Sequence, residues 1–196
     1  QTVRALAPSF GGINLEDIAA PRCFDIEDAL QDLGIPVFHD DQHGTAIAVL
    51  AAVINALLVT NRRIEDTKFV FAGAGAGGIA STKLLLDHGA KHVILVDSVG
   101  IISRDRTDLT AVKSAMLGTT NLDNLSGGIA DAMRGADVFI GLAAGDMISP
   151  EMVTSMAKDS IVFAMANPIP EIWPDLAKAA GAAVVGTGRS DFPDFI

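Results

Sequence analysis

Two pairs of adjacent acidic side chains, Glu16-Asp17 and Asp40-Asp41, occur within the first 41 residues of this 196-residue chain, each at the edge of an apolar stretch. Adjacent carboxylates are commonly solvated loop charges, but partly buried like charges repel unless a cation or a proton compensates them. Carboxylate oxygens favour a hard ion such as Mg²⁺ or Mn²⁺ over zinc, although His39 and His43 flank the second pair. The acids therefore predict a divalent-cation site, with solvated surface charge as the alternative.

A glycine-rich loop stands between a short apolar run, Lys68–Ala72, and a pattern typical of a helix. In this context a glycine loop binds the pyrophosphate of a dinucleotide at the helix N-terminus, whereas glycines alone are equally typical of a packing turn. Gly73 permits the tight turn, Gly75 lets the backbone approach the phosphates, and Gly78 lets the helix pack against the strand. We therefore expect a dinucleotide to bind at Gly73, Ala74, Gly75, Ala76, Gly77 and Gly78.

An acidic residue, Asp97, ends the next apolar run, about 20 residues after the glycine loop. An acid at this place accepts hydrogen bonds from the ribose hydroxyls of the adenosine half. Asp97 would repel the 2′-phosphate of NADP, which favours NAD, whereas Ser98 and Lys113 could accept that phosphate. A cation site beside a nicotinamide site is what a metal-assisted hydroxy-acid dehydrogenase requires, because hydride leaves a carbon whose hydroxyl group the metal has acidified.

Polar residues also follow two later apolar runs. Asn167 comes directly after Ile161–Ala166, where its amide could hold a substrate carboxylate or a nicotinamide-ribose hydroxyl, or could simply start a turn. Arg189 could pair with a substrate carboxylate or with its neighbour Asp191. Both residues are candidates for the site, each with a structural alternative.

Short apolar runs alternate with helical patterns along the chain, which is typical of βαβ units and a parallel sheet. The predicted strands are Ile35–Phe38, Lys68–Ala72, His92–Asp97, Asp137–Gly141, Ile161–Ala166 and Ala183–Gly186. The predicted helices are Cys23–Asp32, Gly44–Thr60, Gly77–His88, Gly128–Arg134, Pro150–Ala157 and Pro174–Ala180. The polar segment 98–126 gives no clear assignment. The sequence therefore predicts an α/β fold of the doubly wound, Rossmann type, with a mostly parallel sheet and helices on both faces.

Composition and charge exclude several classes of protein. The net charge of −10, with the 14 Lys and Arg residues scattered, disfavours a nucleic-acid partner or an anionic membrane surface. The apolar stretch Ala46–Val59 is shorter than the ~20 residues that cross a bilayer, and we interpret it as a buried helix. The single cysteine, Cys23, permits no internal disulfide, which favours a reducing compartment and a cytoplasmic location.

No repeat or long linker divides the chain, so we expect residues 1–196 to form a single NAD(P)-binding domain, in which residues 1–45 contribute the edge that holds the metal. The first residues lack an initiator Met, and the last ones lack a helix-ending signal. We therefore expect this chain to be a piece of a longer one.

The succession FGGINLEDI, PVFHDDQHGTAI, GAGAGGIA, VDS, ANPIPE and TGRSDFP resembles the prokaryotic-type malic enzymes across essentially the whole chain. The resemblance implies oxidative decarboxylation of (S)-malate to pyruvate and CO₂, with reduction of NAD or NADP. It implies that Glu16, Asp17 and Asp41 bind Mg²⁺ or Mn²⁺, and that Asp40 supports these ligands without binding the metal directly. It also implies that Asn167 reaches both substrate and nicotinamide. Besides the glycine loop, the expected coenzyme-binding residues are Thr45, Asp97, Ser98 and Asn167.

In this family a Lys and a Tyr from a preceding domain transfer the protons, and this chain contains no Tyr. We therefore expect the chain to bind coenzyme but to be nearly inactive alone, and we expect the enzyme to be at least a dimer. The chain ends in Asp194-Phe195-Ile196, where the family continues SDFP with Asn-Gln. Two alternatives remain open, namely a related metal-dependent dehydrogenase acting on tartrate or another substituted malate, and a noncatalytic NAD-binding module.

Overall fold

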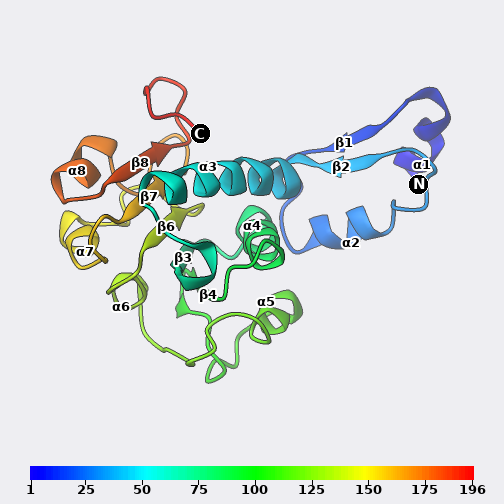
Figure 1. Ribbon diagram of the computed structural model, residues 1–196. Helices are drawn as coiled ribbons and strands as arrows, with labels where there is room; N and C mark the ends of the chain where they lie inside the picture. Colours follow the sequence, from blue (N-terminus) through cyan, green and yellow to red (C-terminus); the bar gives the residue numbers. More distant parts are fainter.

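Eight β-strands form two separate sheets in the computed structural model, which describes residues 1–196 (Figure 1). The two-stranded sheet pairs β1 (Ile13–Leu15) with β2 (Val37–His39) in parallel. The six-stranded sheet has the order β5-β4-β3-β6-β7-β8, and all its neighbours are parallel except β4 and β5. Its strands are β3 (Lys68–Ala72), β4 (His92–Asp97), β5 (Gly100–Ile101), β6 (Val138–Gly141), β7 (Ile161–Ala164) and β8 (Val184–Thr187).

The order of the large sheet reverses at β3, because the chain adds β4 on one side of β3 and later returns to add β6 on the other. Such a reversal leaves a crevice at the carboxyl ends of the strands, where open α/β sheets bind their ligands. The predicted doubly wound, mostly parallel sheet is confirmed.

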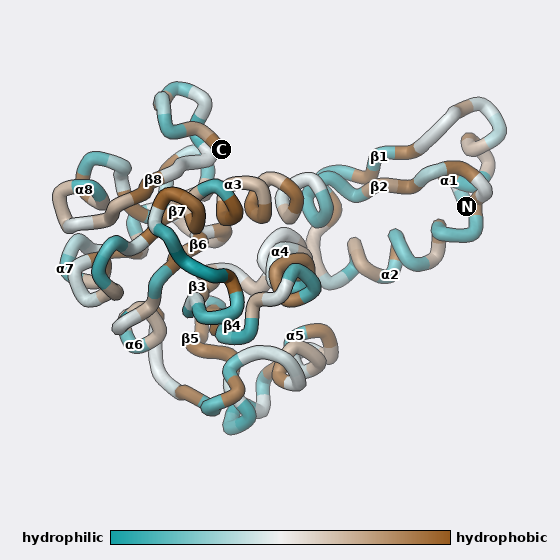
Figure 2. The backbone as a smooth tube through the Cα atoms, viewed as in Figure 1, coloured by the Kyte–Doolittle hydropathy of each residue, from teal (hydrophilic) through white to brown (hydrophobic).

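Helices cover both faces of this sheet, and the side chains of β3 show the two faces directly. Phe69 and Phe71 belong to one hydrophobic core, which α3, α4 and α5 complete. Val70 and Ala72 point the opposite way, into a second core completed by α6, α7 and α8. Much of α3 is accordingly coloured as hydrophobic in the backbone trace (Figure 2). The helices are α1 (Thr2–Leu6), α2 (Arg22–Asp28), α3 (Thr45–Val59), α4 (Ala76–Asp87), α5 (Ala111–Met116), α6 (Ile129–Met133), α7 (Pro150–Thr154) and α8 (Pro174–Ala179).

The apolar stretch in α3 differs from its prediction in two ways. A π-helical turn, Asp40–Gly44, runs directly into α3, so Asp40–Val59 forms 20 residues of helix, long and apolar enough to cross a membrane by length and composition. The helix is also not buried all round. Val49 and Val53 are fully buried against the sheet, whereas Leu58 and Val59 are 75% and 76% exposed.

The ends of several elements depend on tertiary contacts. The predicted helix Cys23–Asp32 ends at Asp28 in the structure, where the chain begins to turn toward Pro36. The predicted strand Ile161–Ala166 ends at Ala164, because the N–H group of Ala166 donates to the carboxylate of Glu171 instead of to a neighbouring strand. The apolar patterns do not predict β1, β5, α1 or α5, each of which is only two to six residues long.

The first 39 residues form an arm that projects from the body of the molecule (Figure 1). Its two strands pair in register, with Ile13 opposite Val37 and Leu15 opposite His39. The acidic pairs follow these strands directly, so the pairing of β1 with β2 brings the two acidic segments side by side.

Candidate functional site

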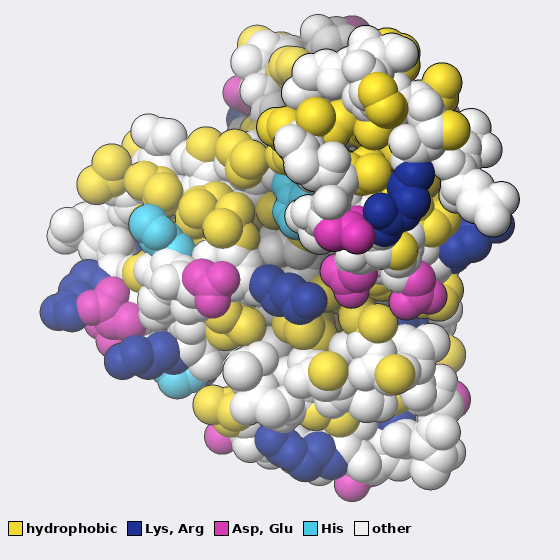
Figure 3. All heavy atoms as spheres, turned by 90° about the vertical axis from the view of Figure 1, so that its right-hand side faces the viewer, with side chains coloured by type: hydrophobic (Ala, Val, Ile, Leu, Met, Phe, Trp, Pro, Cys, Tyr) yellow, Lys and Arg dark blue, Asp and Glu magenta, His cyan; other side chains and the backbone are white.

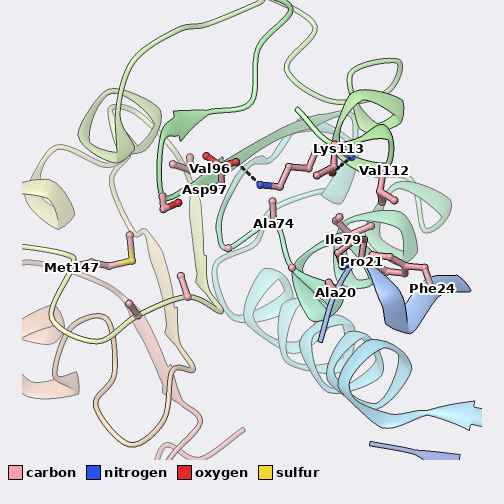
Figure 4. A pocket seen from close by; sticks show the side chains of 16 residues that line it. Ala20, Pro21, Phe24, Ala74, Ile79, Val96, Asp97, Val112, Lys113 and Met147 are labelled. Carbon is pink, nitrogen blue, oxygen red and sulfur yellow. Dashed lines mark hydrogen bonds and ion pairs between the residues drawn. The ribbon is translucent and has the colours of Figure 1, made fainter. Parts of the chain in front are cut away.

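A cavity of about 520 Å³ lies at the carboxyl ends of β3, β4 and β6, at the reversal of the strand order (Figure 4). Three groups of residues line it: the glycine loop, the segment after β4, and the segment after β6, with part of the arm closing one side. The lining residues are Ala20, Pro21, Phe24, Gly73, Ala74, Gly75, Ile79, Val96, Asp97, Ser98, Thr110, Val112, Lys113, Ala143, Ala144 and Met147. The cavity therefore contains five of the predicted coenzyme-binding residues.

The glycine loop has the tight geometry that its sequence predicts. Gly73 has a φ of +110°, and a Cβ atom there would lie 2.5 Å from the carbonyl oxygen of Leu142. At Gly78, a Cβ atom would lie 1.8 Å from the carbonyl oxygen of Gly73. By contrast, a Cβ atom at Gly75 would meet nothing within 4 Å, so the loop backbone is open to a ligand there. Since α4 begins at Ala76, the loop leads straight into a helix N-terminus that favours a phosphate.

Two cations surround Asp97 at the end of β4, and its carboxylate is 7% exposed. Its Oδ1 accepts a hydrogen bond from Arg106 at 2.7 Å. Its Oδ2 accepts one from Lys113 at 2.6 Å, and Figure 4 shows this second contact. Burial on its own raises the pKa of Asp97, but the hydrogen bonds from Arg106 and Lys113 outweigh it and hold the pKa well below its usual range. Asp97 is therefore ionised at neutral pH, with its charge compensated within the protein.

Two further parts of the cavity wall are apolar, and both come from residues that the sequence does not single out. Ala143, Ala144 and Met147 follow β6, while Pro21 and Phe24 belong to the arm. In Figure 4, Met147 lies on one side of the cavity and the arm residues on the other. Small apolar residues carry no chemical signal, and only their position after a strand of the second half of the sheet could have identified them.

The two acidic segments meet each other next to the glycine loop. The backbone N–H group of Asp17 donates a hydrogen bond to Oδ2 of Asp41 at 2.8 Å. A Cβ atom at Gly77 would lie 3.1 Å from both the carbonyl oxygen of Asp41 and the side chain of Thr45. The segment of Asp41 thus packs against the start of α4, and acids and glycine loop share one region of the molecule.

A buried carboxylate that the sequence analysis missed braces this acidic region. Glu27 of α2, 8% exposed, accepts a hydrogen bond from Nε2 of Gln42 at 2.8 Å, and its other oxygen lies 2.6 Å from Nε2 of His43. His39 is fully buried, and neither of its ring nitrogens has a hydrogen-bond partner. His43 is bound to Glu27, and neither histidine belongs to a group of three or more His, Cys, Asp or Glu side chains that could hold a metal ion.

The carboxylate oxygens of this region suit a hard divalent cation, but the side chains do not converge around a single point. Glu16, Asp17 and Asp40 are exposed, and Asp41 is half-buried. Nowhere in the chain do three or more His, Cys, Asp or Glu side chains converge as a metal site. Metal ligation by Glu16, Asp17 and Asp41 thus stays a prediction, while the adjacency of the two segments is observed.

Asn167 lies outside the cavity at the glycine loop, in a separate hollow at the end of β7 and β8 that it shares with Arg189 and Asp191. Its amide donates to the carbonyl oxygen of Gly188 at 3.2 Å. Arg189 pairs with Asp191 at 2.6 Å and lies 5.4 Å from the ring centre of Trp173. Of the two alternatives for Arg189, the structure has the ion pair with Asp191.

The fold and the cavity define a dinucleotide-binding domain of the Rossmann type, with acidic segments next to its glycine loop. Residues 42–190 match the family described as "Malic enzyme, NAD binding domain", and the chain belongs to this family.

Known proteins similar to the chain carry malic enzyme names. The chain is 54% identical over 197 residues to the NAD-dependent malic enzyme of Geobacillus stearothermophilus, a match that covers 100% of this chain and 41% of that protein. It is 50% identical to the NADP-dependent malic enzyme of Rhizobium meliloti, covering 98% of this chain and 25% of that protein. The crystal structure of the NAD-dependent malic enzyme of Thermotoga maritima has a TM-score of 0.97 and 48% identity, covering 100% of this chain and 52% of that one. The chain therefore spans about half, or less, of the length of these relatives.

Proposed function

We propose that the whole protein oxidatively decarboxylates (S)-malate to pyruvate and CO₂ while reducing NAD, and that this chain supplies the coenzyme cavity and the metal-binding edge. The observation that carries the proposal is the contact of the Asp41 segment with Gly77 at the start of α4, together with the hydrogen bond from Asp17 to Asp41, which puts carboxylates beside the glycine loop. Oxidation of a hydroxy acid needs its carbon close to both a Lewis acid and a nicotinamide ring. The names of the similar proteins support malate as the substrate.

The acidic segments would hold Mg²⁺ or Mn²⁺ through Glu16, Asp17 and Asp41, with Asp40 supporting them from the π-helical turn. When bound, the cation would supply positive charge at the hydroxyl and carboxylate of malate, and later at the enolate oxygen. The backbone N–H group of Asp17 holds the Asp41 carboxylate, and Glu27 holds Gln42 and His43, which follow Asp41 in the same turn. The resemblance assigns the proton transfers to a Lys and a Tyr, and we propose that these come from the rest of the whole protein, since this chain has no Tyr.

We propose NAD rather than NADP as the coenzyme. Asp97 is ionised and buried at the place where a ribose 2′-group binds, and its ion pairs hold Arg106 and Lys113 at the carboxylate instead of leaving them free for a phosphate. Calorimetric titration of the whole protein with both coenzymes tests this, and we expect the Kd for NAD to be the lower by about tenfold or more. Equal or tighter binding of NADP would refute the assignment.

Asn167 is proposed to contact substrate and the nicotinamide ribose, because it follows β7 at the carboxyl edge of the sheet.

Steady-state kinetics of the whole protein with Mn²⁺ and NAD, on malate and tartrate side by side, test the choice of substrate. We expect a higher kcat/KM for malate, and a clear preference for tartrate would replace the proposal with a related β-decarboxylating dehydrogenase. Absence of turnover on either, with NAD still bound, would favour a noncatalytic module.

A further inference from the structure

Glu171 is a buried carboxylate that has no cationic partner. Its side chain is 0% exposed, and no Lys, Arg or His lies within ion-pair distance of it. Instead, Oε1 accepts a hydrogen bond from the backbone N–H group of Ala143 at 3.0 Å, and Oε2 accepts one from that of Ala166 at 3.1 Å. Burying an acid without a counter-charge costs free energy, which raises the question of what the hydrogen bonds of this carboxylate hold in place.

The two hydrogen bonds join segments that follow two different strands. Ala143 belongs to the segment after β6, which lines the coenzyme cavity, and Ala166 stands directly before Asn167, after β7. The backbone reinforces the junction, since Asp146 donates to the carbonyl oxygen of Pro170 at 2.9 Å and Ile148 donates to that of Glu171 at 3.0 Å. Glu171 therefore fixes the positions of both segments relative to each other.

Gly141 has no side chain, and the carboxylate of Glu171 occupies the space this leaves beside the sheet. A Cβ atom at Gly141, the last residue of β6, would lie 2.3 Å from the carboxylate carbon of Glu171 and 2.6 Å from each of its oxygens. Any side chain at position 141 would displace the carboxylate, because atoms never approach so closely without a shift. Burial raises the pKa of Glu171, and the hydrogen bonds from Ala143 and Ala166 offset part of that rise.

The segments that Glu171 joins belong to one half of the coenzyme site. In a doubly wound sheet each half holds one nucleotide, and Asp97 after β4 marks the adenosine half. Ala143, Ala144 and Met147 after β6 line the opposite part of the cavity, and Asn167 follows the next strand. The nicotinamide half therefore falls on the segments that Glu171 ties together.

We propose that Glu171 is a positioning residue for the nicotinamide half of the coenzyme, acting through the backbone of Ala143 and Ala166. This inference rests on the proposed dinucleotide-dependent function. A carboxylate suits the role because both of its oxygens accept, whereas a Gln amide offers one acceptor and places an NH₂ group against the second N–H donor. Glu171→Gln should therefore release one of the two segments while keeping the size of the side chain.

The test compares ligands that contain one or both halves of the coenzyme. Calorimetric titration of the whole protein is carried out with NAD and with AMP, for the wild type and for Glu171→Gln. We expect the Kd for NAD to rise about tenfold in the variant, because a buried donor is left unsatisfied, while the Kd for AMP stays within about twofold. A purely structural defect would weaken both ligands alike, and that result, or no change for either, would overturn the inference.

Matched variants separate this role from general effects. Glu151→Gln makes the same change at an exposed position in the first turn of α7, and it should leave both Kd values unchanged. Gly141→Ala pushes on the same carboxylate from β6, and it should reproduce the selective loss of NAD affinity. Failure of the wild type to bind NAD would contradict the proposed function itself, which is a different result from equal binding by wild type and variant.

A second measurement on the unmodified protein covers the case in which Glu171→Gln does not fold. Amide hydrogen exchange is followed for residues 142–147 and 165–168, with NAD or with AMP bound. We expect NAD to slow exchange in these segments and AMP to leave it unchanged, since only NAD reaches the second half of the site. Equal protection by AMP would overturn the inference.

Discussion

At the scale of single residues, Asp97 both lines the cavity and belongs to an ion-pair cluster. Its oxygens bind Arg106 and Lys113, and the backbone N–H group of Val99 donates to it at 3.0 Å. These hydrogen bonds lower the pKa of Asp97 in the folded protein below its ordinary value of 3.8 despite burial. A group whose folded pKa is depressed stabilises the fold above its unfolded pKa and loses that contribution as pH falls through the folded value.

We therefore expect Asp97→Asn to destabilise the protein in a pH-dependent way. At pH 7 the free energy of unfolding should fall by about 3 kcal/mol, because Lys113 is left with no carboxylate partner in a part-buried site. Below about pH 4 the difference in unfolding free energy between the variant and the wild type should narrow, since protonation removes the same charge from Asp97 in the wild type. Denaturant unfolding at several pH values measures both free energies, and a gap that stays constant down to acid pH would contradict the ion-pair account.

Gly78 offers a second test at this scale. Gly78→Ala places a Cβ atom 1.8 Å from the carbonyl oxygen of Gly73, so the loop or α4 must shift. We expect a loss of about 1–3 kcal/mol in unfolding free energy and a severe loss of NAD affinity. Gly118→Ala, where the nearest atom would lie 3.6 Å away, is the control and should change neither quantity. Normal NAD binding by Gly78→Ala would show that the loop does not hold the coenzyme.

At the scale of elements, the sequence predicts the longer parts of the fold and misses the shorter ones. The strands β3 and β4 agree with their predictions because both are continuous apolar runs covered on two faces. The strand β1 has three residues and β5 has two, which is too few for a periodic pattern. Helix α3 was predicted in place, but its composition does not reveal which face the sheet covers, because apolar residues occur all round it.

In the candidate site, too, the sequence predicts some of the residues and misses others. The glycine loop and Asp97 are identifiable because their chemistry depends on spacing along the chain. Glu27 and Glu171 are not, because a single acid becomes informative only when the fold buries it among backbone or side-chain donors. The apolar wall at Ala143 likewise needs the sheet order before its role can be seen.

Helix α2 is expected to brace the π-helical turn that carries the second acidic pair. Glu27→Ala leaves the part-buried polar groups of Gln42 and His43 without their partner, so we expect a loss of about 1–3 kcal/mol in unfolding free energy. Mn²⁺ affinity should fall as well, because the turn holds Asp41. Asp28→Ala, on the exposed end of the same helix, is the control for both measurements. An unchanged Mn²⁺ affinity in Glu27→Ala would mean that α2 does not orient the acids.

At the scale of the whole molecule, the arm and helix α3 are among the places where large hydrophobic side chains remain exposed. Viewed from the side of the arm, the molecule shows many of them over the arm itself (Figure 3). Phe10 and Phe38 of the arm are 53% and 38% exposed, and Leu58 and Val59 at the end of α3 are 75% and 76% exposed. Neighbouring exposed apolar side chains, such as Leu58 and Val59, are typical of association with another protein surface when they belong to a larger patch.

We propose that the whole protein is at least a dimer and that the exposed face of α3 contributes to its association. Leu58→Lys combined with Val59→Lys should shift the protein toward the monomer in sedimentation velocity, while thermal stability at low protein concentration changes little. Lys91→Glu, an exposed charge change near the start of β4, serves as the control. A wild type that sediments as a monomer would contradict the proposal, and an unaffected oligomer in the double variant would exclude this face.

The central claim is that the two acidic segments hold a divalent cation beside the coenzyme, and titration with Mn²⁺ followed by electron paramagnetic resonance tests it most directly. Asp41→Asn preserves an oxygen that can accept from the N–H group of Asp17 but removes the negative charge. We expect the whole wild-type protein to bind a single Mn²⁺ per chain, and Asp41→Asn to bind it about 100-fold more weakly with its NAD affinity retained. Equal Mn²⁺ affinity in the wild type and Asp41→Asn would contradict the account.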